Sequence, residues 1–285
     1  MDDSIPELAD ADPGVFGIAL VFEDGEVRAS DDCSTRYSIQ SAVKPFVYAL
    51  ALADDSDDVL EAVGIEPTGE AFDALYLESG SGRPPNPMVN AGALLTASLV
   101  DGDSVEDRVS RILAGLGQFA GRELDIDESV RGSEQLLGDR NHALGHLMRS
   151  EGTLHVPVDD AVSVYAAACS VVVTTADLAT MAATLAFGGV NPVTGERAIS
   201  REVARDVMSV MATCGVYDGS GRWFRRVGTP AKSSVSGAIV MPVPGRMGAA
   251  MHSPPLNARG TSVRGALAAE VLSDELRLHV LDSNS

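Results

Sequence analysis

Ser41 and Lys44 are the two residues of this sequence whose types and spacing are best suited to chemistry. An apolar run rich in alanine and leucine follows them, and it predicts a buried helix with Ser41 near its start. Side chains three positions apart share a face of a helix, so the hydroxyl and the amine can meet. A serine becomes a nucleophile when a neighbouring base takes its proton, and burial lets a lysine act as that base by disfavouring its charged form.

Lysine is rare in this chain: of 21 lysines and arginines together, only Lys44 and Lys232 are lysines. Lysine, unlike arginine, can lose its proton at accessible pH. Lys232 opens the run Lys232-Ser233-Ser234, in a stretch that predicts a strand. Ser-x-x-Lys near one end of a chain and Lys-Ser/Thr-Gly near the other mark serine acyl-transfer enzymes of the penicillin-recognising type, which this sequence resembles. Ser-x-x-Lys alone is a weak signal, and without further support it is more often a capped helix with a lysine that reaches solvent.

Composition and charge narrow the class of protein. The chain has 285 residues, 45% hydrophobic and 22% charged, as is typical of a soluble globular protein with one large domain or two. Its formal net charge of −20 argues against binding to nucleic acid or to anionic membranes. No apolar run reaches the roughly 18 residues of a membrane span, and the acidic N-terminus is unlike a signal peptide. Three cysteines without a Cys-x-x-Cys motif predict reduced thiols, no metal site and a cytoplasmic location.

Strands are predicted near both ends of the chain, with helices between them. A hairpin is predicted where a buried strand meets the turn at residues 23–26, and residues 66–87 are predicted to form a loop. Strands are expected over 15–22, 223–228, 236–240 and 246–251. Helices are expected over 104–115, 129–149, 161–187, 200–213 and 261–276, with Ser104 as an N-cap.

This order of elements predicts an α+β fold, in which strands from both ends share one antiparallel sheet flanked by helices. We expect a discontinuous α/β domain formed by residues 1–53 and 200–285. Residues 54–199 are expected to form a mostly helical domain. The active site is expected to lie between the two.

The whole sequence resembles the serine-dependent glutaminases, which have a β-lactamase/transpeptidase-like fold. The resemblance covers nearly the whole chain, and the spacings between its motifs also fit. The motifs are residues 37–44 and 86–93, Ser133-Glu134 with Arg140-Asn141, Tyr165 with Cys169-Ser170, and residues 214–218 and 228–235.

The resemblance implies hydrolysis of L-glutamine to L-glutamate and ammonia through a γ-glutamyl ester on Ser41, with no cofactor. Lys44 would be the base or a proton relay, and Tyr217 would share the proton transfer. Backbone N–H groups of Ser41 and Val235 would form the oxyanion hole, with Lys232 and Ser233 supporting the site. The implied substrate-binding residues are Ser41, Asn90, Glu134, Asn141, Tyr165, Tyr217 and Val235. Members of the family are often homodimers or homotetramers, so the implied partners are the small-molecule substrate and further copies of the chain.

The residue types match this substrate, although each also has a structural alternative. A buried carboxylate such as Glu134 can pair with the substrate ammonium, and amide and phenol groups can bind its carboxylate and amide. Read alone, Asn90 could cap a helix. Glu134 and Asn141, seven residues apart, could form the polar face of one helix. Tyr165 could belong to the core, and Tyr217 to a turn.

Four positions depart from the family pattern. Ser4 stands where a tyrosine that reaches the substrate is common, and Ser234 stands where Lys-Ser-Gly has glycine. Asp73 replaces an asparagine, and Pro45 places the start of the helix no earlier than Ser41. Two further functions stay open: another serine acyl-transfer hydrolase of this fold, such as a β-lactamase, peptidase or esterase, and a glutamine-binding protein with impaired catalysis.

Overall fold

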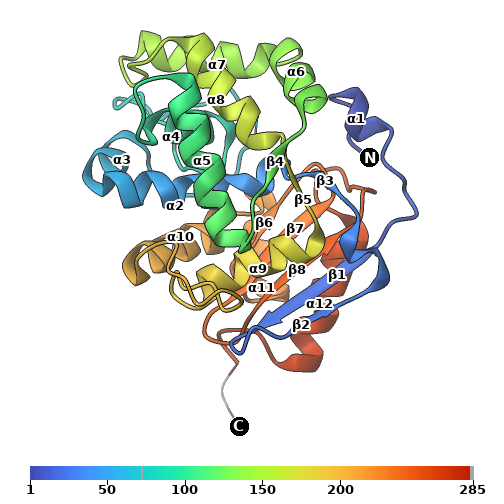
Figure 1. The fold of residues 1–285 in the computed structure, drawn as a ribbon. Coiled ribbons are helices and arrows are strands. Elements are labelled where there is room, and N and C mark those ends of the chain that lie inside the picture. Colours follow the sequence, from blue (N-terminus) through green and yellow to red (C-terminus); the bar gives the residue numbers. More distant parts are fainter. Residues whose placement is uncertain (72, 283–285) are drawn as a thin grey trace.

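The main sheet is built from the two ends of the chain (Figure 1). The computed structural model describes residues 1–71 and 73–282, and its five-stranded sheet has the order β2-β1-β8-β7-β6. All neighbouring strands in it are antiparallel. The predicted α+β class is confirmed. The strands are β1 (Gly17–Phe22), β2 (Val27–Ala29), β6 (Lys232–Ser233), β7 (Ala238–Val243) and β8 (Met247–His252).

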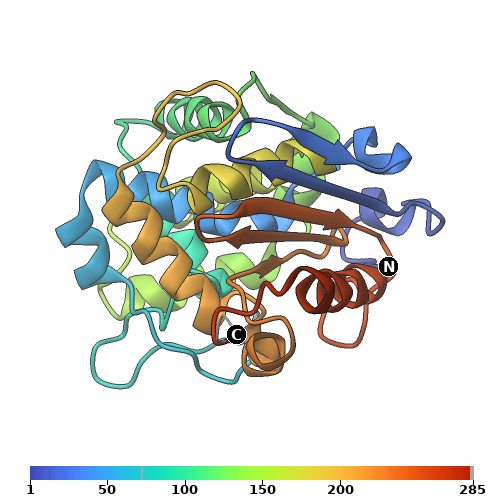
Figure 2. The same cartoon turned by 90° about the horizontal axis from the view of Figure 1, so that it is seen from below.

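Helices cover both faces of this sheet, as Figure 2 shows. Helix α12 (Val263–Leu276) packs against β7 and β8 on one face, and α9 (Thr175–Ala186) packs against β1, β7 and β8 on the other. Every residue of β7 and β8 is therefore buried. In β1, nearer the edge, fully buried and partly exposed residues alternate.

The close approach of α9 to the sheet depends on Gly248 in β8. A Cβ atom at this position would lie 2.1 Å from the backbone N of Ala183 and 2.2 Å from the backbone O of Ala179. Only glycine leaves room for the helix backbone at this distance. Helix α9 thus belongs to the sheet layer, although it lies within residues 54–199. The predicted division into two domains stays a prediction.

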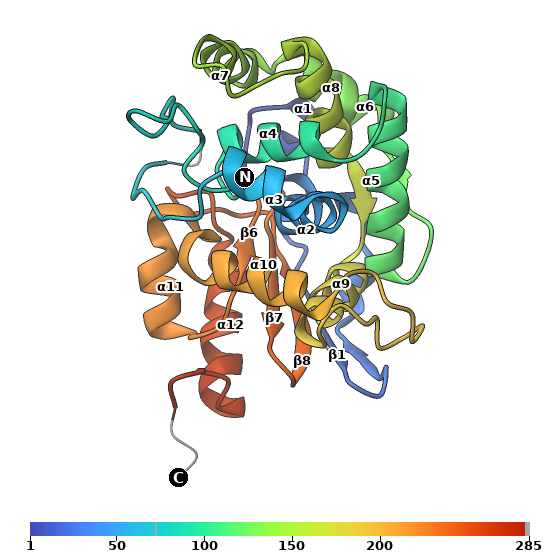
Figure 3. The same ribbon diagram turned by 90° about the vertical axis from the view of Figure 1, so that its left-hand side faces the viewer.

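A largely helical part lies beside the sheet. Figures 1 and 3 show α4, α6, α7 and α8 at the end away from the sheet, with α2 between them and the strands. Residues Lys44 to Leu52 of α2 are all buried, as that central position requires. The helices of this part are α2 (Lys44–Asp54), α3 (Ser56–Ala62), α4 (Asn90–Leu99), α5 (Val105–Ala120), α6 (Glu128–Leu136), α7 (Asp139–Ser150) and α8 (Val158–Cys169). None of the helices in the described residues has the length and apolar character needed to cross a membrane.

Several local predictions are confirmed by the structure. The N-terminal hairpin forms, with Val21 opposite Val27 across its turn. The Ser104 side chain caps α5 by accepting a hydrogen bond from the Asp107 N–H. Helix α10 (Arg201–Cys214) also forms, and Ser200 caps it.

Three other predictions are wrong. The helix expected over 129–149 breaks at Gly138 into α6 and α7. The helix expected over 161–187 is interrupted by strand β5 (Val171–Val173), because three consecutive β-branched valines favour an extended chain. The strand expected over 223–228 is helix α11 (Ser220–Arg226), whose Trp223 packs against the sheet.

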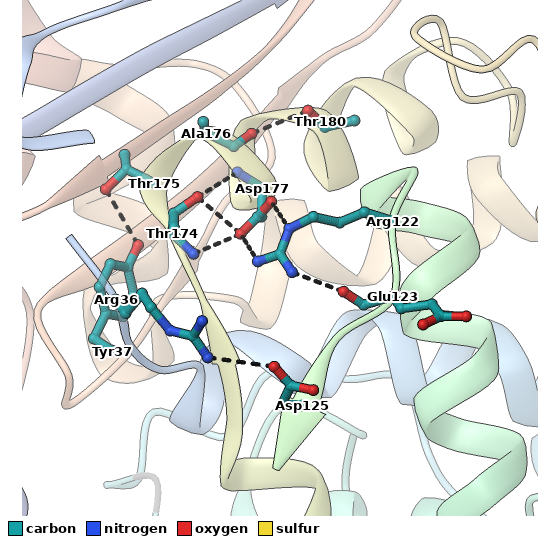
Figure 4. A network of polar contacts seen from close by, with 10 residues as sticks. All are labelled: Arg36, Tyr37, Arg122, Glu123, Asp125, Thr174, Thr175, Ala176, Asp177 and Thr180. Carbon is teal, nitrogen blue, oxygen red and sulfur yellow. Dashed lines mark hydrogen bonds and ion pairs between the residues drawn. The ribbon is translucent and has the colours of Figure 1, made fainter. Parts of the chain in front are cut away.

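A second, small sheet holds the segment that leads into Ser41. Its order is β3-β5-β4, with β3 (Tyr37–Ser38), β5 and β4 (Asp125–Ile126). Asp177 anchors the chain just after β5, as Figure 4 shows: it completes a capping box with Thr174 and accepts hydrogen bonds of 2.7 and 2.6 Å from the Arg122 guanidinium. Burial acts to raise the pKa of the Asp177 carboxyl, but the hydrogen bonds from Arg122 and Thr174 outweigh it and hold the pKa below its ordinary value.

We expect Gly248→Ala to lower the free energy of unfolding by about 2–3 kcal/mol, because the new methyl group overlaps the backbone of α9. Urea unfolding followed by the fluorescence of the single tryptophan measures the change. Gly132→Ala is the matched control, because a Cβ at Gly132 in α6 has open space around it. The control should change stability by no more than about 1 kcal/mol, and in the stabilising direction. Equal stability of the two variants would contradict this account of the packing.

Candidate active site

A cavity of about 320 Å³ brings together residues from distant parts of the sequence. Tyr217 joins the same group through a hydrogen bond with the Ser41 side chain. Lys44 and Lys232 both lie against the Tyr217 ring. The cavity is lined by six of the predicted site residues: Ser41, Asn90, Glu134, Asn141, Tyr165 and Val235.

Ser41 lies in a tight turn that precedes the α-helix. Residues Gln40–Val43 form a 3₁₀ turn, and α2 begins at Lys44 with Pro45 in its first turn. Gln40 has a φ of 50°, a left-handed conformation that is uncommon for a residue other than glycine. Strain of this kind persists where the surrounding structure holds the residue in place, and it clusters at functional sites.

The Lys44 amine is buried and has two fixed acceptors. Its Nζ lies 2.7 Å from Asn90 Oδ1 and 3.1 Å from the Met88 carbonyl oxygen. Burial lowers the pKa of Lys44 to about 7. A neutral amine has two hydrogens, one for each of these acceptors, and it keeps a lone pair for a further proton. Lys44 can therefore act as a base near neutral pH.

Tyr217 contacts both lysines through its ring. Its φ of 53° is also left-handed, and the ring centroid is 3.9 Å from Lys232 Nζ and 5.4 Å from Lys44 Nζ. Burial raises the pKa of Tyr217, and the hydrogen bond with Ser41 only partly offsets this. Burial, with the neighbouring Lys44 charge as a second cause, lowers the pKa of Lys232 well below its ordinary value. The Lys232 amine donates a hydrogen bond of 2.5 Å to the carbonyl oxygen of Ser233, which is itself fully buried.

The polar wall of the cavity is formed by the starts and ends of three helices. Asn90 is the first residue of α4, and its Nδ2 donates to Asn141 Oδ1 at 3.3 Å. Val89 holds the N-cap position of this helix, so the capping alternative for Asn90 is wrong. Glu134 lies in the last turn of α6 and Asn141 in the first turn of α7, so the alternative of a single helical face is also wrong. Tyr165 is part of the main core and also reaches the cavity.

Glu134 is the carboxylate of this wall. Burial raises its pKa, and a hydrogen bond with the Gln40 side chain acts in the opposite direction. The negative charges of Asp2 and Glu7 raise the pKa further. A carboxylate whose charge is disfavoured in this way is stabilised when a cation enters the cavity beside it.

The N-terminal segment closes one side of the cavity. Asp2 and Ser4 line it, so the position at which the resemblance suggests a tyrosine does lie at the cavity. The next residues form the short helix α1 (Pro6–Ala9), and Glu7 in it accepts hydrogen bonds of 2.7 and 3.1 Å from two serines of α6. The apolar residues on either side of Glu7 pack with Val235.

Some cavity residues were not singled out as site residues from the sequence. Gln40 and Cys169 both line the cavity. Each belongs to a family motif that also contains a predicted site residue, and that membership was the sequence signal that could have identified them. Asp73 and Arg140 form an ion pair of 2.8 Å at the cavity. They lie 67 residues apart, and no local pattern links them.

The comparisons with known proteins agree on one family. The family model described as Glutaminase matches residues 1–281. A curated glutaminase from Clavibacter michiganensis subsp. michiganensis is 70% identical over 279 residues, which are 98% of this chain and 86% of the relative. The solved structure of Mglu in its native form has a TM-score of 0.96 at 45% identity, covering 100% of this chain and 70% of that one. Mglu in its glutamate form gives the same TM-score and identity, and covers 100% of this chain and 66% of that one. The expected β-lactamase-like fold is thereby confirmed.

The two lysines allow a direct test of the site's electrostatics. In protein labelled with ¹³C at lysine Cε, we expect two side-chain signals, which a Lys44→Met variant assigns. The Lys44 signal should titrate with a midpoint near the pKa of about 7 that burial produces. The Lys232 midpoint should also lie far below the ordinary 10.5. A Lys44 midpoint close to 10.5 would exclude it as a base at neutral pH.

Proposed function

Because the chain belongs to the glutaminase family, we propose that Ser41 attacks the side-chain amide of L-glutamine and carries the γ-glutamyl group as an ester. The chain is an amidohydrolase that converts L-glutamine to L-glutamate and ammonia. One observation carries the proposed role of Ser41: its hydroxyl is hydrogen-bonded to a buried tyrosine that lies against two buried lysines. These are the groups that a serine nucleophile needs for losing its proton and for returning it.

Lys44 is the base in this proposal, and Tyr217 relays the proton. Burial raises the pKa of Tyr217, so the phenol keeps its proton at neutral pH and can pass one on only while taking another up. Lys44, with a pKa of about 7, is partly neutral under the same conditions. As the Ser41 oxygen bonds to the amide carbon, its proton moves to this pair. The pair then donates it to the departing ammonia, and a water molecule hydrolyses the ester by the same route.

The oxyanion of the tetrahedral intermediate is proposed to bind to the backbone N–H groups of Ser41 and Val235. Both residues line the cavity, and Ser41 lies in the turn at the start of α2. Backbone N–H groups held in this way stabilise developing negative charge without having to reorganise during the reaction. Such donors are typically worth about 10²–10³ in rate.

Glu134 is proposed to recognise the substrate ammonium, and Asn90, Asn141 and Tyr165 the remaining polar groups. The raised pKa of Glu134 is the supporting observation, because a bound ammonium would compensate its disfavoured charge. A cavity of about 320 Å³ suits a single amino acid. Mglu, the neighbour solved in a glutamate form, supports a ligand of this class.

We also propose that copies of the chain associate with one another. Val263, Leu267 and Val271 recur every four residues along α12 and are 41%, 58% and 60% exposed. They form an apolar stripe on the helix face that points away from the sheet, and the same stripe on a second copy is a natural complement in a symmetric pair. For the compartment we propose the cytoplasm, since Cys33, Cys169 and Cys214 are free thiols and reducing compartments preserve thiols.

Ammonia release from L-glutamine tests the proposed nucleophile. We expect Ser41→Ala to lower kcat at least about 10⁴-fold, because the variant lacks the hydroxyl that is proposed to form the ester. L-asparagine is the control substrate, and circular dichroism with thermal unfolding checks that the variant is folded. Glutamine-dependent ammonia release by Ser41→Ala at the wild-type rate would exclude the acyl-enzyme. A folded wild-type protein that binds glutamine without releasing ammonia would instead be the impaired binding protein.

Glu134→Gln tests recognition of the ammonium. The wild type should prefer L-glutamine strongly over 4-carbamoylbutanoate, which lacks the α-amino group. Only L-glutamine carries an ammonium that can pair with the Glu134 carboxylate. In Glu134→Gln this ratio of kcat/KM values should fall at least about tenfold, with KM for glutamine raised. Glu128→Gln is the matched control, since Glu128 lies at the other end of the same helix and is 74% exposed. An unchanged ratio in Glu134→Gln would assign the ammonium to another group.

A further inference from the structure

Ser234 ties the turn between β6 and β7 to the turn that holds Ser41. Its hydroxyl donates a hydrogen bond of 3.0 Å to the carbonyl oxygen of Ile39, across a separation of 195 residues. The same carbonyl accepts from the backbone N–H of Ala42 at 3.2 Å and thereby closes the Ser41 turn. Ser234 is only 1% exposed, so water does not compete for its hydroxyl.

The direction of this hydrogen-bond chain follows from the number of protons. A serine hydroxyl has one hydrogen, and Ser234 gives its own to Ile39, whose carbonyl can only accept. In the 2.9 Å contact between the two side chains, the Ser236 hydroxyl must therefore be the donor to Ser234. The backbone N–H of Ser236 also points to the Ser234 oxygen, at 3.4 Å. The Ser234 hydroxyl is thus held in one orientation.

A second set of contacts closes the network. His252 Nε2 lies 3.1 Å from the carbonyl oxygen of Ser236, to which it donates. The His252 ring stacks on Tyr37, with centroids 3.6 Å apart. Tyr37 lies in β3, two residues before Ile39. A closed loop of buried contacts therefore runs from Tyr37 through His252, Ser236 and Ser234 to Ile39.

This loop joins the two backbone segments that the proposed oxyanion hole requires. Gln40, directly after Ile39, has the left-handed φ of 50° that sets the direction of Ser41. Val235 lies between Ser234 and Ser236 and lines the cavity. We infer that Ser234 is a positioning residue of the reaction, whose hydroxyl holds the Ser41 turn and Val235 in register with each other. The inference rests on the proposed function of Ser41 and Val235.

A glycine at this position, as in the Lys-Ser-Gly pattern of the family, has no hydroxyl to offer. In this chain the link between the two segments therefore depends on a side chain. Misplacing reacting groups by about 1 Å can cost about 10²-fold in rate. The proposed substrate contacts of Asn90 and Asn141 come from α4 and α7 and should be unaffected.

The test compares Ser234→Ala with Ser273→Ala. Ser273 is the matched control, because it is 2% exposed and its hydroxyl donates to a distant backbone carbonyl, that of Val227, at 2.7 Å. It lies in α12, outside the cavity. Alanine at either position keeps the Cβ atom and removes the hydrogen bond that the hydroxyl donates to a distant carbonyl. Ser234→Ala also removes the acceptor of the Ser236 hydroxyl, so it should lose more thermal stability than Ser273→Ala.

Two readouts separate positioning from stability. Calorimetric titration with L-glutamate gives the number of competent sites and the Kd, and ammonia release then gives kcat per competent site. For Ser234→Ala we expect kcat per site to fall at least about tenfold, with KM and the glutamate Kd within about twofold of wild type. Ser273→Ala should keep the wild-type kcat per site. A wild-type kcat per site in Ser234→Ala, or equal losses in both variants, would overturn the inference.

If Ser234→Ala does not fold, Ser236→Ala decides the matter, because it removes the donor that orients the Ser234 hydroxyl. Like Ser234→Ala, Ser236→Ala should lower kcat per site without changing the glutamate Kd. A wild-type kcat per site would refute the inference. Failure of the proposed function is recognised separately. If Ser41→Ala is active, Ser41 is not the nucleophile and the proposed function fails. If Ser41→Ala is inactive and Ser234→Ala is fully active, only the role of Ser234 is refuted.

Discussion

The burial of the Lys44 amine is the constraint on which the site depends. A charged ammonium is costly in a low-dielectric interior, and the cost is relieved when the amine loses its proton near neutral pH. Helix α2 places the amine there, since it is the central helix and its residues from Lys44 to Leu52 are all buried. Met88 and Asn90, at the start of α4, then supply the two acceptors that a neutral amine can satisfy.

The second lysine experiences the same effect. Lys232 lies in an edge strand at the far end of the sequence, and both lysines lie over the Tyr217 ring. Burial, together with the neighbouring charge of Lys44, disfavours the charged form of Lys232 and lowers its pKa. This coupling suits general base chemistry, and it explains why arginine, which cannot lose its proton in proteins, would not serve at either position.

The turn that contains Ser41 (residues 40–43) is held by several contacts, and each of them is with a distant part of the sequence. β3 leads into it from the small sheet, where Ile39 donates its N–H to the Val171 carbonyl at 2.8 Å. From the main sheet, Ser234 donates a hydrogen bond to the carbonyl oxygen of Ile39. These contacts fix the backbone around Gln40, so its left-handed conformation is tolerated. The two ends of the chain therefore meet at one turn, where the proposed nucleophile lies.

Much of the local structure could be predicted from the sequence, because it depends on neighbours along the chain. The N-terminal hairpin and the serine caps of α5 and α10 are interactions within a few residues. The α+β class also followed from the order of strands and helices. The long predicted helices failed at Gly138 and at the valines of β5, where packing and sheet pairing outweigh helical periodicity.

The assembly of the candidate site was decided by the tertiary structure alone, apart from what the family motifs suggested. Glu134 and Asn141 line one cavity because α6 and α7 turn at Gly138, which no seven-residue spacing on a single helix would produce. The Asp73–Arg140 ion pair and the link from Ser234 to Ile39 join residues that are distant in the sequence. The sequence by itself determined which groups were available for chemistry. Their burial, and with it the pKa values that make them useful, came from the packing of helices and sheet around them.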